Sequence, residues 1–179
     1  MTALPFFLPR LKLLAALLAV LSALTGCSPR LNWRQVQDAD ARFAVLLPAK
    51  PATLARTIDL DGIRVTMSMT AAEVDGVTFA VGAIALPDAA LAPKALQAMQ
   101  LALVRNINGS VRSERATGSS VDIVASGSIG SGREPARLLA RFAAREQRVY
   151  QAIMVGRSSA MDAIGADAAD TFFTSLKVR

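Results

Sequence analysis

Few residue types in this chain could do chemistry. The chain has no His, the commonest general base and metal ligand, and it has a single Cys, at position 27. Its many Ser and Thr residues form neither a G-x-S-x-G elbow nor an S-x-x-K pair. A site built on Lys or on two distant carboxylates stays open, although only Lys50, Lys94 and Lys177 follow residue 26. The composition therefore predicts a protein that is not an enzyme.

Two stretches match ligand-binding loops only in part. Residues 126–132, SGSIGSG, are rich in Gly but lack the GK[ST] ending and the helix of a phosphate-binding loop, so they predict a hairpin connection. Asp59 and Asp61 have the spacing that opens a calcium loop, but the 12-residue pattern with its terminal Glu is absent. These aspartates predict turns. The sequence therefore indicates no cofactor and no metal site.

Cys27 follows an N-terminal segment that is typical of exported proteins. Arg10 and Lys12 precede an apolar run over residues 13–24. This run is shorter than the roughly 20 residues that a membrane-spanning helix needs. A positive segment followed by a short apolar run and small residues predicts a signal peptide rather than a permanent anchor.

The residues around Cys27 resemble the lipobox of bacterial lipoproteins. In LTGC, residues 24–27, a hydrophobic residue and small residues precede the Cys. The resemblance implies that residues 1–26 are a lipoprotein signal peptide, cleaved between Gly26 and Cys27. It also implies that the thiol receives a diacylglycerol and that the new amine is acylated, as by palmitate. An ordinary secretory signal with an incidental Cys, or an uncleaved anchor, is the alternative.

A lipid on Cys27 would hold the protein on the bacterial cell envelope, facing the periplasm. Two or three acyl chains anchor firmly, since each buried methylene contributes about 0.8 kcal/mol. Inner-membrane lipoproteins of enteric-type bacteria usually carry Asp where this chain has Ser28, so the outer membrane is expected rather than the inner. Residues 27–32 form the lipidated tether, which spans at most about 17 Å. The remaining domain, 33–179, is expected close to the bilayer.

Residues 43–86 contain the clearest strand signals. Phe43–Pro48 alternates and stops at Pro, and three longer runs over 52–86 are separated by Asp61-Gly62 and Asp75-Gly76. Asp-Gly favours the type I′ turn of a two-residue hairpin, because this turn needs positive φ at both central residues. These signals predict an antiparallel meander. Residues 33–41 before it predict a short helical turn.

The rest of the chain predicts a helix, two strand pairs and a final helix. Asp88 can cap the first helix, which ends at Asn108-Gly109. One strand pair surrounds Gly118, the other surrounds residues 145–147, and the final helix covers about 160–176. The apolar stripes of the helices are Leu96, Met99, Leu103 and Ile107 in the first, and Met161, Ile164, Ala168, Phe172 and Leu176 in the second.

These blocks predict an α+β fold in one domain, with helices covering an antiparallel sheet. The opening FAVLLPAKP, the strand pair ARLLARF and RVYQAIMVG, and the closing TFFTSLKV resemble bacterial lipoproteins of unknown function. The lipoproteins in question have a PsbP-like α/β/α sandwich, and DcrB-like proteins are among them. The resemblance covers nearly all of 33–179 and implies an antiparallel β-sheet flanked by helices on both faces. Such relatives tend to be binding or assembly subunits, and no catalytic residue comes with the family.

Four arginines recur at every fourth residue between positions 133 and 145. Pro135 and the β-rich continuation favour a strand, in which side chains two apart share one face. The arginines could contact anionic headgroups or an acidic partner, at about 1 kcal/mol each. Alternatively they form a solvated face whose ion pairs contribute about 0–1 kcal/mol. The outward set is Arg133, Arg137, Arg141 and Arg145 with Leu139, and the inward set is Glu134, Ala136, Leu138, Ala140 and Phe142.

Other residues near the tether or in the core have two interpretations each. Arg30 and Arg34 lie next to the lipid in sequence and are further candidates for contact with headgroups or a partner. Trp33 could rest at the membrane interface or pack against the domain. Met67, Met69 and Met99 fill the core rather than line an adaptable binding surface.

The sequence therefore predicts a membrane-anchored periplasmic lipoprotein that acts as a non-catalytic interaction or assembly module of the cell envelope. Its partners would be the membrane, through the lipid anchor, and an envelope protein. Nucleic acid is excluded, because the basic residues face a compartment without it. The alternative is a carrier or sensor of a small apolar ligand in a cleft between sheet and helices. A hydrolase would instead need a pocket with converging polar groups.

Overall fold

The computed structural model describes residues 30–179. The predicted signal peptide, the cleavage site at Gly26 and Cys27, and the lipidation of Cys27 lie outside the described residues. Residues Leu31–Arg179 form one compact unit, called the body below. Within residues 30–179, no helix combines the length and the apolar character needed to cross a membrane.

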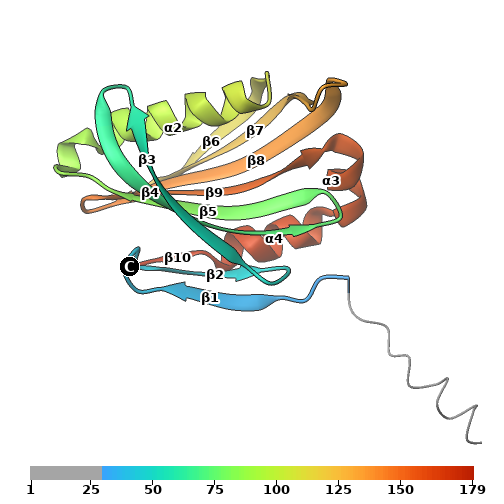
Figure 1. The fold of residues 1–179 in the computed structure, drawn as a ribbon, viewed down its shortest axis with the longest axis horizontal. Coiled ribbons are helices and arrows are strands. Elements are labelled where there is room, and N and C mark those ends of the chain that lie inside the picture. Colours follow the sequence, from blue (N-terminus) through green and yellow to red (C-terminus); the bar gives the residue numbers. More distant parts are fainter. Residues whose placement is uncertain (1–29) are drawn as a thin grey trace, which may run out of the picture. The chain divides into compact units, whose positions relative to one another are not determined.

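A seven-stranded antiparallel sheet is the centre of the body (Figure 1). Its strand order is β3-β4-β5-β9-β8-β7-β6, so β3 and β6 are the edge strands. The strands are β3 (Ala52–Leu60), β4 (Ile63–Val74), β5 (Val77–Ala85), β6 (Ser110–Thr117), β7 (Ser120–Ile129), β8 (Glu134–Arg145) and β9 (Arg148–Arg157).

A second, smaller sheet joins the two ends of the body. Strand β2 (Phe43–Leu47) lies between β1 (Arg34–Asp38) and β10 (Lys177–Val178), and both neighbours are antiparallel to it. The chain therefore starts and finishes the body in the same sheet.

Helices cover both faces of the large sheet, as Figure 1 shows. The helix α2 (Ala92–Asn106) lies on one face, after the 3₁₀ turn η1 (Ala89–Leu91). The helices α3 (Ser158–Ile164) and α4 (Ala166–Ser175) lie with the small sheet on the other face. The fold is thus α+β, with an antiparallel sheet flanked by helices on both faces, as the sequence predicts.

The two Asp-Gly turns have the predicted geometry. Asp61 and Gly62 have φ of 54° and 86°, and Asp75 and Gly76 have φ of 51° and 74°. Positive φ at both central residues is the type I′ requirement. The Asp59 carboxylate accepts a hydrogen bond from the Gly62 N–H at 2.7 Å, so this residue serves the turn, as predicted.

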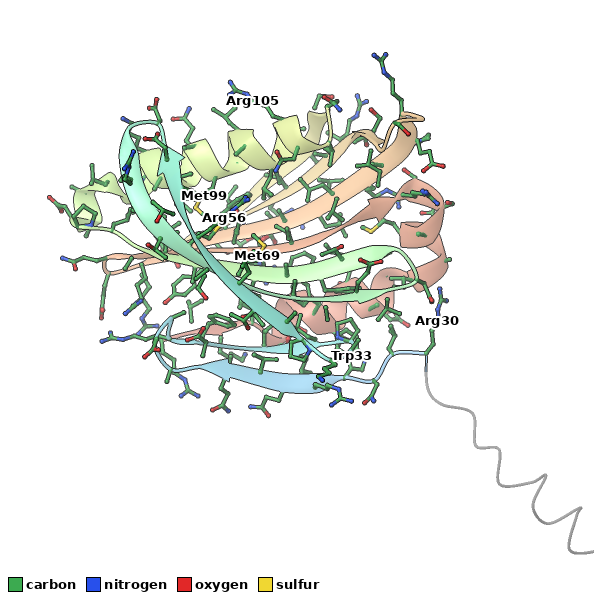
Figure 2. All side chains as sticks on the ribbon, viewed as in Figure 1. Arg30, Trp33, Arg56, Met69, Met99 and Arg105 are labelled. Carbon is green, nitrogen blue, oxygen red and sulfur yellow. The ribbon has the colours of Figure 1, made fainter. Side chains whose placement is uncertain are left out.

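Two hydrophobic clusters form the core, one on each face of the large sheet. Under α2 the buried residues include Met67 and Met99, which confirms their predicted core positions. Figure 2 shows Met99 pointing from α2 toward the sheet. On the other face Phe79 of β5 makes an edge contact with Phe172 of α4, at 5.4 Å between ring centroids. Trp33 contacts Phe79 in the same way at 6.3 Å, so the indole packs against the body.

Three sequence predictions are wrong. Residues 33–41 do not form a helical turn: β1 occupies Arg34–Asp38, because pairing with β2 satisfies its backbone groups. The final helix is two helices, since Gly165 between them has φ of 88° and ψ of 164°, a backbone region that is essentially restricted to Gly. Glu134 does not point into the core, because it is partly exposed and pairs with Arg157.

Candidate functional site

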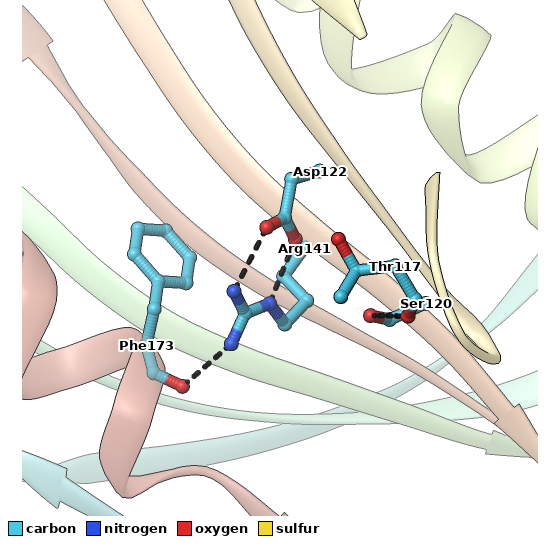
Figure 3. A network of polar contacts seen from close by, with 5 residues as sticks. All are labelled: Thr117, Ser120, Asp122, Arg141 and Phe173. Carbon is cyan, nitrogen blue, oxygen red and sulfur yellow. Dashed lines mark hydrogen bonds and ion pairs between the residues drawn. The ribbon is translucent and has the colours of Figure 1, made fainter. Parts of the chain in front are cut away.

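Arg141 lies at the centre of a polar network on β8 (Figure 3). Its Nε donates to Asp122 Oδ1 at 2.7 Å and its Nη2 to Asp122 Oδ2 at 2.8 Å, so the pair is bidentate. Asp122 is the register partner of Arg141 across β7 and β8. The hydrogen bond to Asp122 raises the pKa of Arg141, against the opposing effect of burial. Two-point pairing fixes the orientation of the guanidinium group.

The same guanidinium group also holds α4 on the sheet. Its Nη1 donates to the backbone O of Phe173 at 2.9 Å. The Phe173 ring lies 5.7 Å from the guanidinium carbon, within cation–π range. Arg141 therefore connects β7, β8 and α4.

The neighbouring arginines of β8 bind the C-terminal elements on either side of α4. Arg137 Nη1 donates to Asp162 Oδ1 of α3 at 2.6 Å. Arg145 Nη1 donates to the backbone O of Val178 in β10 at 3.3 Å. Three successive arginines thus hold three successive C-terminal elements. Arg133 is different: it lies in the turn before β8 with φ of 51° and is exposed.

The side of β8 that carries Arg137, Arg141 and Arg145 is called the arginine stripe. It is not the solvent-exposed sheet face that the alternation of side chains suggests, because C-terminal elements cover it. Sequence patterning places Arg137, Arg141 and Arg145 on one side of β8 but does not show that α3, α4 and β10 cover that side. Within this side of β8, the ion pair of Arg141 with Asp122 is of the kind expected for a sheet face. Contact of Arg133, Arg137, Arg141 and Arg145 with headgroups or a partner stays a prediction.

Arg30 and Arg34, the two arginines near Cys27 in the sequence, are both exposed. Arg34 is the exposed first residue of β1, in register with Leu47 of β2. Arg30 is exposed and lies outside the compact unit. Headgroup contact of Arg30 and Arg34 also stays a prediction.

A groove, called the α4 groove below, runs between α4 and strands β7 and β8. One hollow of about 230 Å³ contains Asp122, Arg141 and Phe173. A second hollow of about 410 Å³ continues toward α3 and shares Leu139 and Asp170 with the first. The groove combines an apolar floor with charged walls.

A second cationic site, called the basic corner below, lies where the β8–β9 turn meets the small sheet. Its members come from three segments that are far apart in the sequence. The backbone N–H of Arg179 donates to the O of Arg42 at 2.9 Å, and Arg145 and Arg148 are register partners at the end of the β8–β9 hairpin. The basic corner consists of Arg42, Arg145 and Arg148, together with Arg179, whose backbone is bound to Arg42.

Acidic side chains neutralise only part of the basic corner. Arg42 pairs with Glu146 at 3.4 Å, and both side chains are largely exposed. Among the described residues, no ion pair joins an acidic side chain to Arg145 or Arg148. A hollow of about 330 Å³ opens between Arg42, Glu146 and Arg148.

A buried hydroxyl lies beside this corner. Tyr150 is fully buried, and among the described residues its hydroxyl has no hydrogen-bond partner. Burial raises the pKa of Tyr150, while the positive charges of Arg148, Arg42 and Arg145 oppose the rise and Glu146 adds to it. An unpaired buried hydroxyl costs about 1–3 kcal/mol.

Sequence analysis missed most of the basic corner. Only Arg145 belongs to the regular spacing, and the other members are scattered from position 42 to position 179. The predicted hairpin around residues 145–147 is the one local signal that could bring Arg145 and Arg148 together. The contribution of β10 could not be inferred, because two residues carry no periodicity.

The other sequence candidates take structural roles. Asp61 pairs with Lys94 at 3.1 Å, and in the stretch 126–132 only the last residues belong to the turn, since β7 continues to Ile129. Within residues 30–179, no group of three or more acidic or Cys side chains could hold a metal ion.

Comparisons with known proteins give a fold and no sequence family. No family model matches the chain, and no curated protein matches its sequence. The solution structure of the cyanobacterial PsbP protein CyanoP from Synechocystis is 12% identical, with a TM-score of 0.52. That match covers 88% of this chain and 99% of CyanoP.

A crystal structure from Bacteroides thetaiotaomicron is also 12% identical, with a TM-score of 0.47 over 82% of this chain. The chain spans about half of that protein, 48% of its length. Likeness at such low identity concerns the fold alone. From the CyanoP match and the layers described above, the fold of this chain is PsbP-like.

Proposed function

We propose that this chain is a lipoprotein of the bacterial cell envelope whose PsbP-like body is a non-catalytic interaction or assembly module. Cys27 carries the lipid, the body faces the periplasm, and the outer membrane is favoured over the inner. An envelope protein is the expected partner.

The observation that carries the proposal is the distance in sequence between Cys27 and the body. The lipobox-like LTGC ends at Cys27, and β1 starts at Arg34. A tether of this length spans at most about 25 Å. An acylated Cys27 would therefore keep the body beside the bilayer, where it could meet other envelope proteins.

The build of the body supports a binding role. Arg137, Arg141 and Arg145 fasten the C-terminal elements to the large sheet. The basic corner is then presented by strands and a tight turn. Sites built on strands and helices hold their geometry better than sites on loops.

Intact mass and fractionation of the native protein test the anchor. We expect wild type to lack residues 1–26, to carry diacylglycerol and an N-acyl chain, and to sediment with membranes. Cys27→Ser should lose the lipid mass and leave the membrane fraction, whereas the matched Ser28→Thr variant should keep both. Ser28→Asp should shift the lipidated protein toward the inner membrane if the enteric sorting rule applies. A native protein with unmodified Cys27 would refute the proposal.

A second candidate function rests on the α4 groove. Leu139 and Phe173 line a groove between sheet and helix, which suits the apolar part of a small ligand. Native mass spectrometry of the full-length protein would show extra mass if a ligand copurifies. Leu139→Trp should abolish that mass by filling the shared floor of the two hollows, while Leu54→Trp, on the exposed edge strand β3, should not.

A further inference from the structure

We infer that the basic corner is a docking surface for an acidic segment of an envelope protein. The inference rests on the proposed function, which it extends by naming the partner's chemistry.

Like charges are held together at the corner. Arg145 and Arg148 face each other in the last register pair of the β8–β9 hairpin. Like charges directly opposite each other destabilise a strand pair. Arg145 binds only the backbone O of Val178, and Glu146 binds Arg42 instead. Carboxylates supplied by another chain would offset this repulsion.

Three described acidic side chains near the corner, Glu146, Asp38 and Asp40, form no ion pair with Arg145 or Arg148. Glu146 pairs with Arg42, and the Asp38 carboxylate accepts the backbone N–H of Ala41 at 2.8 Å. Asp40 and Asp38 lie with Arg148 around an adjacent hollow of about 400 Å³, and no ion pair joins them to it. Arg145 and Arg148 therefore keep positive charges that carboxylates of a partner would neutralise.

The corner is held in place by backbone bonds. The Leu86 N–H donates to the O of Gln147 at 2.7 Å, which fixes the β8–β9 turn against the end of β5. The Arg179 N–H donates to Arg42 at 2.9 Å, which fixes the C-terminal cation beside the β1–β2 turn. A preorganised set of cations loses little freedom when a partner binds.

The polar lining of the corner hollow favours a protein partner over a lipid surface. The chain enters the body beside Pro48, whose O accepts the Asn32 N–H at 2.8 Å. Strand β1 then leads away from this point to Arg42 at the opposite end of the small sheet, about 17 Å on. The corner hollow between Arg42, Glu146 and Arg148 is small and polar, which suits carboxylate side chains.

Binding of a defined acidic peptide by the full-length mature lipoprotein in nanodiscs tests the inference. The probe is a fluorescent ten-residue peptide of Glu and Gly, and its control has Gln in place of Glu. We expect R145Q/R148Q to weaken binding of the Glu peptide about tenfold. The matched variant R105Q/R112Q removes the same charge from exposed sites on α2 and β6 and should change binding less than threefold. Figure 2 shows Arg105 pointing away from the sheet. Melting curves of all variants report whether the fold is kept, and R148Q alone serves if the double variant unfolds.

Each outcome decides the inference. Corner-dependent binding that falls with added salt and is absent for the Gln peptide supports it. Equal weakening by both double variants means that net charge alone attracts the peptide, and overturns it. Corner-dependent binding to vesicles of phosphatidylglycerol and phosphatidylcholine, without binding of the Glu peptide, overturns it in favour of a lipid surface. Intact mass of the same samples reports the lipid on Cys27 separately, so loss of the anchor is distinguishable from failure of the corner.

Discussion

The backbones of Gly127 and Gly109 are in direct van der Waals contact. A Cβ atom on Gly127 would lie 2.7 Å from Gly109 Cα and closer still to the O of Ile107. The Ser128 N–H donates to this same oxygen at 2.6 Å. The loop that ends α2 thus lies directly on β7, so the close approach of two glycines sets where α2 meets the sheet.

Replacing Gly127 by Ala should lower the free energy of unfolding by about 3 kcal/mol, because the added methyl group meets backbone atoms that cannot move aside. Gly132→Ala is the matched control: its Cβ would have one neighbour, Glu134 Cγ, at an ordinary 3.8 Å. Urea unfolding followed by circular dichroism measures both. Equal stability of the two variants would contradict the close crossing.

The Asp122–Arg141 pair should contribute more than an exposed pair. Both side chains are about one-third exposed, against 52% and 69% for Arg42 and Glu146. A double-mutant cycle with Asp122→Asn and Arg141→Gln should give a coupling energy of about 1–2 kcal/mol. The Arg42–Glu146 cycle should give less than about 0.5 kcal/mol. Similar values for both cycles would show that partial burial and bidentate geometry do not strengthen the Asp122–Arg141 pair.

Removing the Tyr150 hydroxyl should not destabilise the protein. Because the buried hydroxyl has no partner among the described residues, Tyr150→Phe should leave the free energy of unfolding unchanged or raise it by about 1 kcal/mol. Thermal unfolding at neutral pH measures the change. A loss of more than about 1 kcal/mol would mean that the hydroxyl binds a water or a ligand in solution.

Stability should fall at alkaline pH through Tyr150. Its pKa is raised in the folded chain, so the unfolded chain releases the phenolic proton first as pH rises. The stabilisation that protonated Tyr150 gives the folded state is therefore complete below about pH 10. It is lost as the pH rises toward the pKa of Tyr150 in the folded state. Tyr150 is the sole Tyr of the chain, so phenolate absorbance reports this residue alone. The Tyr150→Phe variant should lose less stability over the same pH range; an identical loss would contradict the assignment.

Trp33, the sole Trp, should report the cooperativity of the N-terminal segment. Because its ring packs on Phe79, its emission should be blue-shifted in the folded protein and should change together with circular dichroism during urea unfolding. Phe79→Leu should shift the emission to the red. A Trp33 transition at lower urea than the circular dichroism transition would show that the segment detaches by itself.

Local chemistry made much of the large sheet predictable. Asp61-Gly62 and Asp75-Gly76 set two hairpins, since few other dipeptides adopt positive φ so readily. The pairs around Gly118 and residues 145–147 are also present, as β6–β7 and β8–β9. In each case adjacent strands pair, so the information lies in a short stretch of chain.

Long-range contacts could not be predicted. Strand β1 is polar and short, and it is a strand because β2 lies beside it. Alternation along β8 separated its two faces but could not show that α3 and α4 cover the arginine face, since both faces of the sheet are buried. Prediction of the basic corner would also have required long-range contacts, because the small sheet brings Arg42 and Arg179 together.

The pairing of β10 with β2 restricts the order in which the fold can form during synthesis. Phe43 of β2 is in register with Val178, so one of the earliest strands of the body is closed by one of its last residues. During synthesis, which proceeds from the N-terminus, one edge of β2 has no neighbour until almost the whole body has been made. Over that interval the nascent chain exposes unpaired backbone N–H and C=O groups along this edge, which favour pairing with strands of other molecules.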